Sequence, residues 1–197
     1  MTTTNLIDST RASAHNIPTS TLKVGGYVTG TSDVRWTAAD WARHPGAGHV
    51  RINQGLGTFD PLGCDVLDVE DQALNVAQAV QGVKARISHG ITWTTIYGSD
   101  SVLAAIEHAL IAAGPHGWYF GHVDAWLANW DLSQDEAAAL LSKKLHGLTV
   151  RAVQWASPTS NPNTEMPGSS LTLSQANCDL SVSQPAWHAF VPGEPPA

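Results

Sequence analysis

Short runs of apolar and β-branched residues alternate along the chain with longer stretches of helical period. From Leu74 to Ile87 apolar residues recur at intervals of three or four, which predicts a helix over 73–87. Residues 91–97 are mostly β-branched or aromatic, which predicts a buried strand. The same reasoning predicts further helices at 37–44, 100–113 and 133–145, and further strands at 5–9, 24–30, 49–53, 64–70, 125–130, 148–155 and 178–182.

Local signals fix several helix starts. Thr37 and Asp40 have the spacing of a capping box, as do Ser133 and Glu136, and Asp100 is placed to cap a third helix. No helical period is found in 54–63 or in the polar stretch 157–175, so both are predicted to be loops.

Strands that alternate with helices imply a parallel sheet with right-handed crossovers, and eight such strands imply closure into a ring. The fold class predicted is therefore α/β, a compact (β/α)8 TIM-like barrel with some helices missing or reduced. The 197 residues are expected to form this one domain, 1–197, with 192–197 as a tail. That is short for a fold that usually needs about 250 residues.

Charge and composition argue against some classes of binding partner. The net charge is −7 with only ten Lys and Arg, which argues against a nucleic-acid partner. We see no secretory signal and no stretch long enough to span a bilayer, so we expect no membrane partner and a protein made soluble in the cytoplasm. The two cysteines, Cys64 and Cys178, are predicted to be unpaired core residues.

The nine histidines are scattered and none falls at the spacing of a zinc site, so neither a metal nor another cofactor is predicted. Eight Trp residues are many for this length. Trp is more often part of a core than of a ligand platform, but a groove that binds sugar rings also needs exposed aromatic faces.

Two carboxylates give the clearest chemical signal. Asp68 and Glu70 end the run 64–70, and because side chains alternate along a strand, both should face one way, with Cys64 and Val66 beneath them. At the carboxyl end of a barrel strand, such a pair lies where active sites form. Close carboxylates raise each other's proton affinity, so one acid and one base can coexist near neutral pH. The alternative is that a carboxylate here only caps the next helix, and Asp71 is an equal candidate for that cap.

The order of the strand-end motifs resembles that of the family 25 glycoside hydrolases, the lysozyme-type barrels of bacteria and phages, and more closely still a group of glycoside-hydrolase-like barrels of actinobacteria and their phages. In those lysozymes an acid ends the first strand, Asp-x-Glu the fourth, Ile-Tyr lies on the fifth, Leu-Trp-x-Ala on the sixth, Trp-Gln-Tyr on the seventh, and an Asp opens the eighth. The matching residues here are Asp8, Asp68 and Glu70, Ile96-Tyr97, Trp126-Leu127-Ala128, Gln154-Trp155 and Asp179.

The resemblance implies a hydrolase that cleaves bacterial cell-wall glycan, the peptidoglycan, with retention. Glu70 would be the general acid, Asp68 would orient the acetamido group of the substrate, and Asp8 and Asp179 would hold the polar network. One well-placed acid can suffice when the substrate assists its own hydrolysis. The residues that would line the sugar sites are Tyr97, Trp126, Asn129, Gln154 and Trp155.

Two alternatives remain open at this stage. The first is a catalytically silent barrel that binds the cell wall or serves as a structural protein of a phage tail or virion, with other virion proteins as partners. The second is a metal-dependent hydrolase in which Asp8, Asp68 and Glu70 bind magnesium or calcium through their oxygens.

Overall fold

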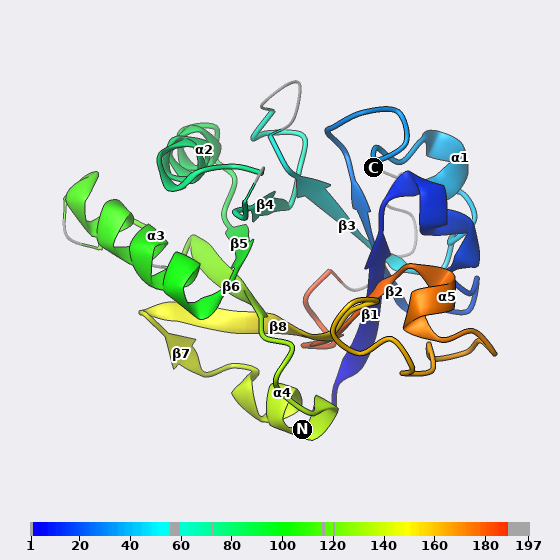
Figure 1. Cartoon of the computed structure of the whole chain (residues 1–197). Coiled ribbons are helices and arrows are strands. Elements are labelled where there is room, and N and C mark those ends of the chain that lie inside the picture. The colour runs from blue at the N-terminus through cyan, green and yellow to red at the C-terminus, as the bar shows by residue number, and fades with distance from the viewer. Residues whose placement is uncertain (1, 56–59, 72, 116, 120, 189–197) are drawn as a thin grey trace.

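The computed structural model describes residues 2–55, 60–71, 73–115, 117–119 and 121–188. Its centre is a closed barrel of eight strands, as predicted (Figure 1). A ninth, two-residue strand, β7 (Lys144–Leu145), pairs antiparallel with β8. The barrel strands are β1 (Thr4–Ser9), β2 (Lys23–Tyr27), β3 (Gly48–Asn53), β4 (Val66–Asp68), β5 (Thr94–Gly98), β6 (Val123–Ala128), β8 (Leu148–Ala156) and β9 (Asp179–Ser183).

One strand runs against the others. β1 to β6 are parallel in sequence order, and β6 pairs with β8 in parallel to continue the ring. β9 then pairs antiparallel with both β8 and β1 and closes it. The prediction of an all-parallel sheet is therefore wrong at the last strand.

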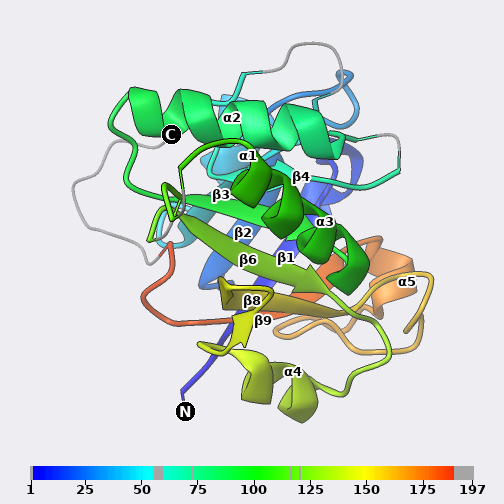
Figure 2. The ribbon, with the colours of Figure 1, turned by 90° about the vertical axis from the view of Figure 1, so that its left-hand side faces the viewer.

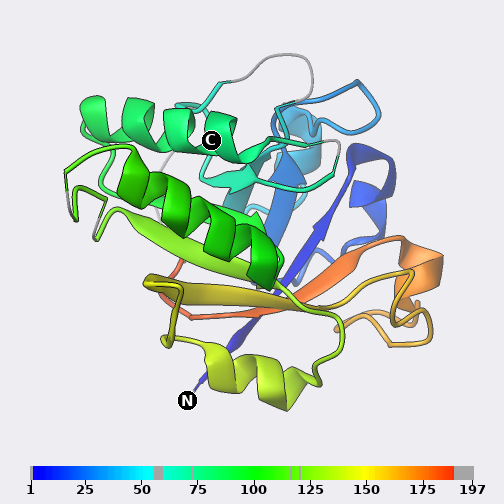
Figure 3. The same ribbon diagram turned by 60° about the vertical axis from the view of Figure 1, so that its left-hand side comes forward.

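The helices do not alternate regularly with the strands. The two longest, α2 (Val76–Ser88) and α3 (Asp100–Ala112), lie side by side over β4, β5 and β6, and α4 (Gln134–Leu140) packs on β8 and β9 (Figures 2 and 3). On the other side, η1 (Arg11–Asn16), α1 (Ala38–Trp41) and α5 (Leu173–Ala176) are one or two turns each. No helix joins β3 to β4 in the described residues, as predicted. The barrel is thus confirmed, whereas a regular (β/α)8 arrangement is not what the chain forms.

Two of the predicted helix starts are confirmed and two are corrected. The capping boxes that begin at Thr37 and Ser133 are both present. α3 is capped by Ser99, one residue before the predicted Asp100. α2 is capped by Asn75, which forms its own capping box with Gln78, so the alternative that Asp71 caps this helix is wrong.

Both faces of the sheet are buried. Leu6, Val50, Val66 and Trp126 fill the barrel interior, while alternate residues such as Leu67 pack outward under the helices. Cys64 belongs to this outer cluster, so only Val66 lies beneath Asp68 as predicted. Both cysteines are buried and unpaired, as expected.

The amino-terminal end of the barrel is closed by the chain that follows β9. The indole N–H of Trp187 donates to Thr95 Oγ1 at 3.3 Å, and its ring lies 5.8 Å from that of Trp126. Beside it the Lys23 ammonium donates to Ser183 Oγ and to the Gln184 carbonyl. Burial lowers the pKa of Lys23 to about 8. Across the described residues, no helix is long and apolar enough to cross a membrane.

Candidate active site

Four carboxyl groups from distant parts of the chain meet at the other end of the barrel. Asp8 is the last inward-facing residue of β1, Asp68 ends β4, Glu70 follows two residues later, and Asp179 opens β9. Asp8 and Asp179 are direct partners across the β1–β9 ladder. The reversed direction of β9 is what places the first residue of that strand at the mouth, because a parallel β9 would put it at the opposite end.

The four groups differ sharply in exposure. Asp8 and Asp68 are 3% and 1% exposed, Asp179 is partly buried, and Glu70 is open to solvent. Asp8 Oδ1 and Asp68 Oδ1 are buried and have no hydrogen-bond partner in the described part of the chain. Burying an unpartnered charged oxygen is costly, so these carboxyl groups are expected to hold protons.

Burial and mutual repulsion shift the acidity of the whole cluster in one direction. Burial raises the pKa of Asp8 well above its usual value, and the charges of Asp179, Asp68 and Glu70 raise it further. Burial, followed by the charge of Glu70, likewise raises the pKa of Asp68 and brings that of Asp179 to about 7. Loss of solvation also raises the pKa of Glu70, so the one solvent-accessible acid retains its proton to a higher pH than a free side chain.

Tyr97 and Gln154 connect the acids. The Tyr97 hydroxyl donates to the side-chain oxygen of Gln154, and interaction with Tyr97 lowers the pKa of Glu70 as interaction with Gln154 lowers that of Asp179, against the larger effect of burial. Both connecting residues face inward on neighbouring parts of the barrel and are nearly buried. This network fixes Glu70, which lies beyond the end of its strand, relative to the barrel wall.

A glycine makes room for Asp8. Gly25 is the partner of Asp8 on β2, and a Cβ atom added to it would lie 2.6 Å from the Cβ of Asp8. Real Cβ atoms do not approach so closely, and β2 is held by hydrogen bonds on both sides. Gly25 is therefore a requirement of the site and not only of the strand.

We expect Gly25→Ala to lower the free energy of unfolding by about 1–3 kcal/mol, the usual cost of overpacking a well-ordered interior. Urea denaturation measures this. The matched control is Gly46→Ala, because an added Cβ at Gly46 meets nothing within 4 Å. A Gly25→Ala protein as stable as the Gly46→Ala protein would contradict the close approach.

The residues predicted from the sequence to line the sugar sites lie in different parts of the structure. Tyr97 and Gln154 are part of the carboxyl network. Trp126 is 1% exposed and its indole N–H donates to Ser181 Oγ at 3.1 Å, so it fills the barrel interior and does not line an open site. Trp155 packs outward among the core residues, and the Asn129 side chain accepts a hydrogen bond from the backbone of Asp131.

A pocket of about 480 Å³ opens beside the carboxyl cluster. Asp179 lines the pocket and is one of the four acids. Tyr27 also lines the pocket, and the charges of the four acids act on its hydroxyl group. Trp130, just after β6, and residues 157–160, just after β8, complete much of the wall. Sequence reasoning missed Tyr27 and Trp130, although both follow the rule that functional side chains gather at strand ends.

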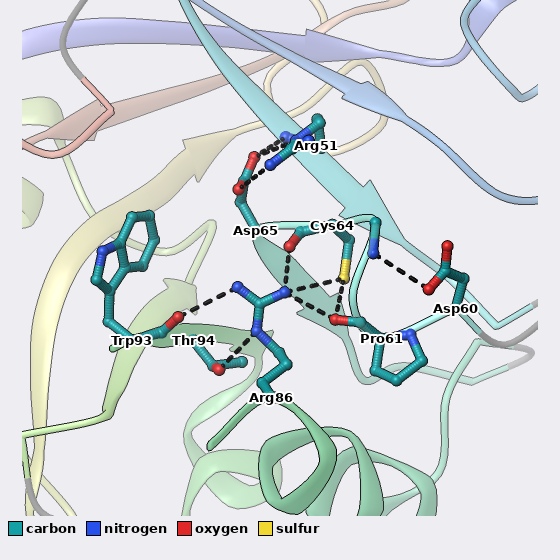
Figure 4. A network of polar contacts seen from close by, with 9 residues as sticks. Arg51, Asp60, Pro61, Cys64, Asp65, Arg86, Trp93 and Thr94 are labelled. Carbon is teal, nitrogen blue, oxygen red and sulfur yellow. Dashed lines mark hydrogen bonds and ion pairs between the residues drawn. The ribbon is translucent and has the colours of Figure 1, made fainter. Parts of the chain in front are cut away.

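A polar network holds β4, and with it Asp68, in register. The Arg86 guanidinium from α2 donates to Thr94 Oγ1 at 2.8 Å, to the Pro61 carbonyl at 2.7 Å and to the Cys64 carbonyl (Figure 4). Next to it, Arg51 and Asp65 form a two-fold ion pair, with Nη2 to Oδ1 at 2.9 Å. The described part of the β3–β4 connection contains no helix, and these contacts attach it to α2 and β5.

Within the described residues, no group of three or more His, Cys, Asp or Glu side chains is arranged to hold a metal ion. This arrangement does not favour the alternative of a magnesium or calcium site at Asp8, Asp68 and Glu70. No protein-family model, curated protein or solved structure matches this chain.

Proposed function

We propose that the protein is a glycoside hydrolase that cleaves bacterial cell-wall glycan, with Glu70 as the general acid. The observation that carries the proposal is the convergence of four carboxyl groups at one barrel mouth with only Glu70 exposed. A glycosidase needs a general acid with a raised pKa, and loss of solvation raises the pKa of Glu70 above its usual value.

The neighbouring groups suit the rest of the reaction. A protonated Glu70 can deliver its proton to the glycosidic oxygen, while the Tyr97 hydroxyl holds the carboxyl group in position. The role that the resemblance gives Asp68, orienting the substrate acetamido group for attack on the sugar carbon, would require the mouth to open on binding, because Asp68 is 1% exposed. Asp8 and Asp179 are partners across the β1–β9 ladder, and their raised pKa values would keep a proton near Glu70 after it has donated its own.

The test is the release of reducing ends from purified cell walls, measured for the wild-type protein and for Glu70→Gln. The amide keeps the size of the side chain but has no proton to donate. Release by the wild type that is lost in the variant supports the proposal, and equal release by both proteins contradicts it.

A catalytically silent barrel that binds the cell wall, as a phage tail or virion component, is the second candidate. The observation in its favour is the almost complete burial of Asp8 and Asp68, which leaves only Glu70 and Asp179 of the four acids within reach of a substrate. Such a protein would sediment with insoluble cell wall without releasing reducing ends. An absence of both binding and cleavage would exclude it.

A further inference from the structure

The pocket beside the carboxyl cluster has the size and composition of a ligand site. Its volume of about 480 Å³ falls within the roughly 300–1,000 Å³ of small-molecule sites. Five separate segments supply its wall, from the ends of β1, β2, β6 and β8 and the start of β9. A cavity built from so many strand ends has its shape fixed by the barrel and not by one loop.

The described wall residues are hydroxyl-rich and lack a cation. Ser9, Thr10 and residues 157–160 contribute hydroxyl groups, and none of the described lining residues is Lys or Arg. The one charged group is the Asp179 carboxyl. An anionic ligand would find no partner here and would be repelled, whereas a neutral polyhydroxyl ligand would find donors and acceptors.

Several of these polar groups can still form a hydrogen bond with a ligand. Thr10 and Thr159 have no side-chain hydrogen bond within the described chain. The Asn177 amide nitrogen donates to Ser13 Oγ at 2.9 Å, which leaves its carbonyl oxygen as an acceptor. Ser157 Oγ accepts from the Ser160 backbone at 3.0 Å and retains its own proton for donation.

Two aromatic rings complete the arrangement. Trp130 is 41% exposed, the only Trp among the large hydrophobic side chains recorded as exposed in the described residues. Tyr27 is partly buried and lies between the pocket and the carboxyl groups. An aromatic face beside hydroxyl and amide groups suits the apolar face of a pyranose ring with its hydroxyl groups at the edge.

We propose that this pocket binds one uncharged N-acetylhexosamine ring of the glycan, with Trp130 as its stacking platform, and excludes a ring that carries a carboxylate. The inference rests on the proposed function and makes it more specific. In a polymer that alternates neutral and acidic amino sugars, a pocket that accepts only the neutral ring fixes the register in which the strand lies across the mouth. Trp130 is then a specificity-determining residue, remote from proton transfer.

The first measurement is calorimetric titration with chitotriose, a neutral trimer of N-acetylglucosamine, in the Glu70→Gln protein, where turnover does not interfere. Trp130→Ala in that background should weaken binding about tenfold, because a stacking ring contributes both buried area and ring contact. Leu22→Ala is the matched control. It removes an exposed apolar side chain just before β2, at the opposite end of the barrel, and should leave the dissociation constant unchanged.

The second measurement compares N-acetylglucosamine with N-acetylmuramic acid, which differ only in the lactyl group that carries the carboxylate. The neutral sugar should shift the Trp130 indole N–H resonance, identified as the signal lost in Trp130→Phe, and the acidic sugar at equal concentration should not. Equal shifts by both sugars, or chitotriose affinity that is unchanged in Trp130→Ala, would overturn the inference.

The outcomes separate this inference from the proposed function. If Glu70→Gln abolishes wall cleavage while Trp130→Ala binds chitotriose normally, the pocket assignment fails and the hydrolase stands. If Glu70→Gln cleaves as well as the wild type while Trp130→Ala loses binding, the pocket stands and the role of Glu70 fails.

Discussion

Glu70→Gln is expected to lower the rate of reducing-end release from cell walls by about 10²–10⁴-fold, the range that a positioned general acid contributes. The side chain is exposed, so the variant should keep its fold and its melting temperature. A loss of activity with an unchanged melting temperature therefore reports chemistry and not unfolding.

The adjacent carboxyl group offers a matched control. Asp71 is also exposed, and its charge contributes to the raised pKa of Glu70. Asp71→Asn should retain the rate within a few-fold and move the alkaline limb of the pH–rate profile to lower pH, because it removes one repulsive charge from Glu70. If Asp71→Asn were as inactive as Glu70→Gln, general loss of negative charge and not proton donation would explain both.

Asp179→Asn is expected to stabilise the protein by about 2–4 kcal/mol at pH 8 and to leave its stability nearly unchanged at pH 4. The pKa of Asp179 is raised from its usual 3.8 to about 7 in the folded protein, and each unit corresponds to about 1.4 kcal/mol. At pH 4 the carboxyl group is neutral in the folded chain and only about half ionised in the unfolded chain, so the penalty there is well under 1 kcal/mol. As the pH rises toward 7 the unfolded chain ionises first, so folding stability is lost over this range and stays low above it.

The measurement is urea denaturation of both proteins at pH 4 and pH 8. The pH 4 comparison is the internal control, because Asn there replaces a neutral side chain of nearly the same shape. Asn can still accept the hydrogen bond from Gln154. A variant that is no more stable than the wild type at pH 8 would show that ionised Asp179 carries no penalty at the barrel mouth.

Much of the fold follows from local pattern. All eight strands predicted from sequence overlap observed strands, and the two capping boxes could be recognised as short motifs. The direction of the last strand could not be predicted from such local patterns. The alternation of inward-facing and outward-facing side chains in Asp179–Ser183 is compatible with either strand direction. The antiparallel direction of β9 is decided by its pairing with β8 and β1, which closes the ring.

The residues of the site could be predicted from the sequence only in part. Asp8, Asp68 and Glu70 follow from their positions at strand ends, whereas the inward or outward orientation of Trp126 and Trp155 does not. Both faces of this sheet are buried, so neighbouring apolar residues give no sign of which one faces the barrel axis. The short helix α5 was missed because its signal, a Thr172–Gln175 capping box, lies inside a stretch dominated by Ser, Asn and Pro.

The antiparallel direction of β9 also decides where the two ends of the described chain lie. β9 carries the chain away from the carboxyl groups, and Trp187 packs against Thr95 at the far end, where Thr4 of β1 also pairs with Ser183. Thr4 and Trp187, near the two ends of the described chain, therefore lie at the opposite end of the barrel from Glu70. A surface that contacts the protein at these residues would leave the mouth with its four carboxyl groups unobstructed.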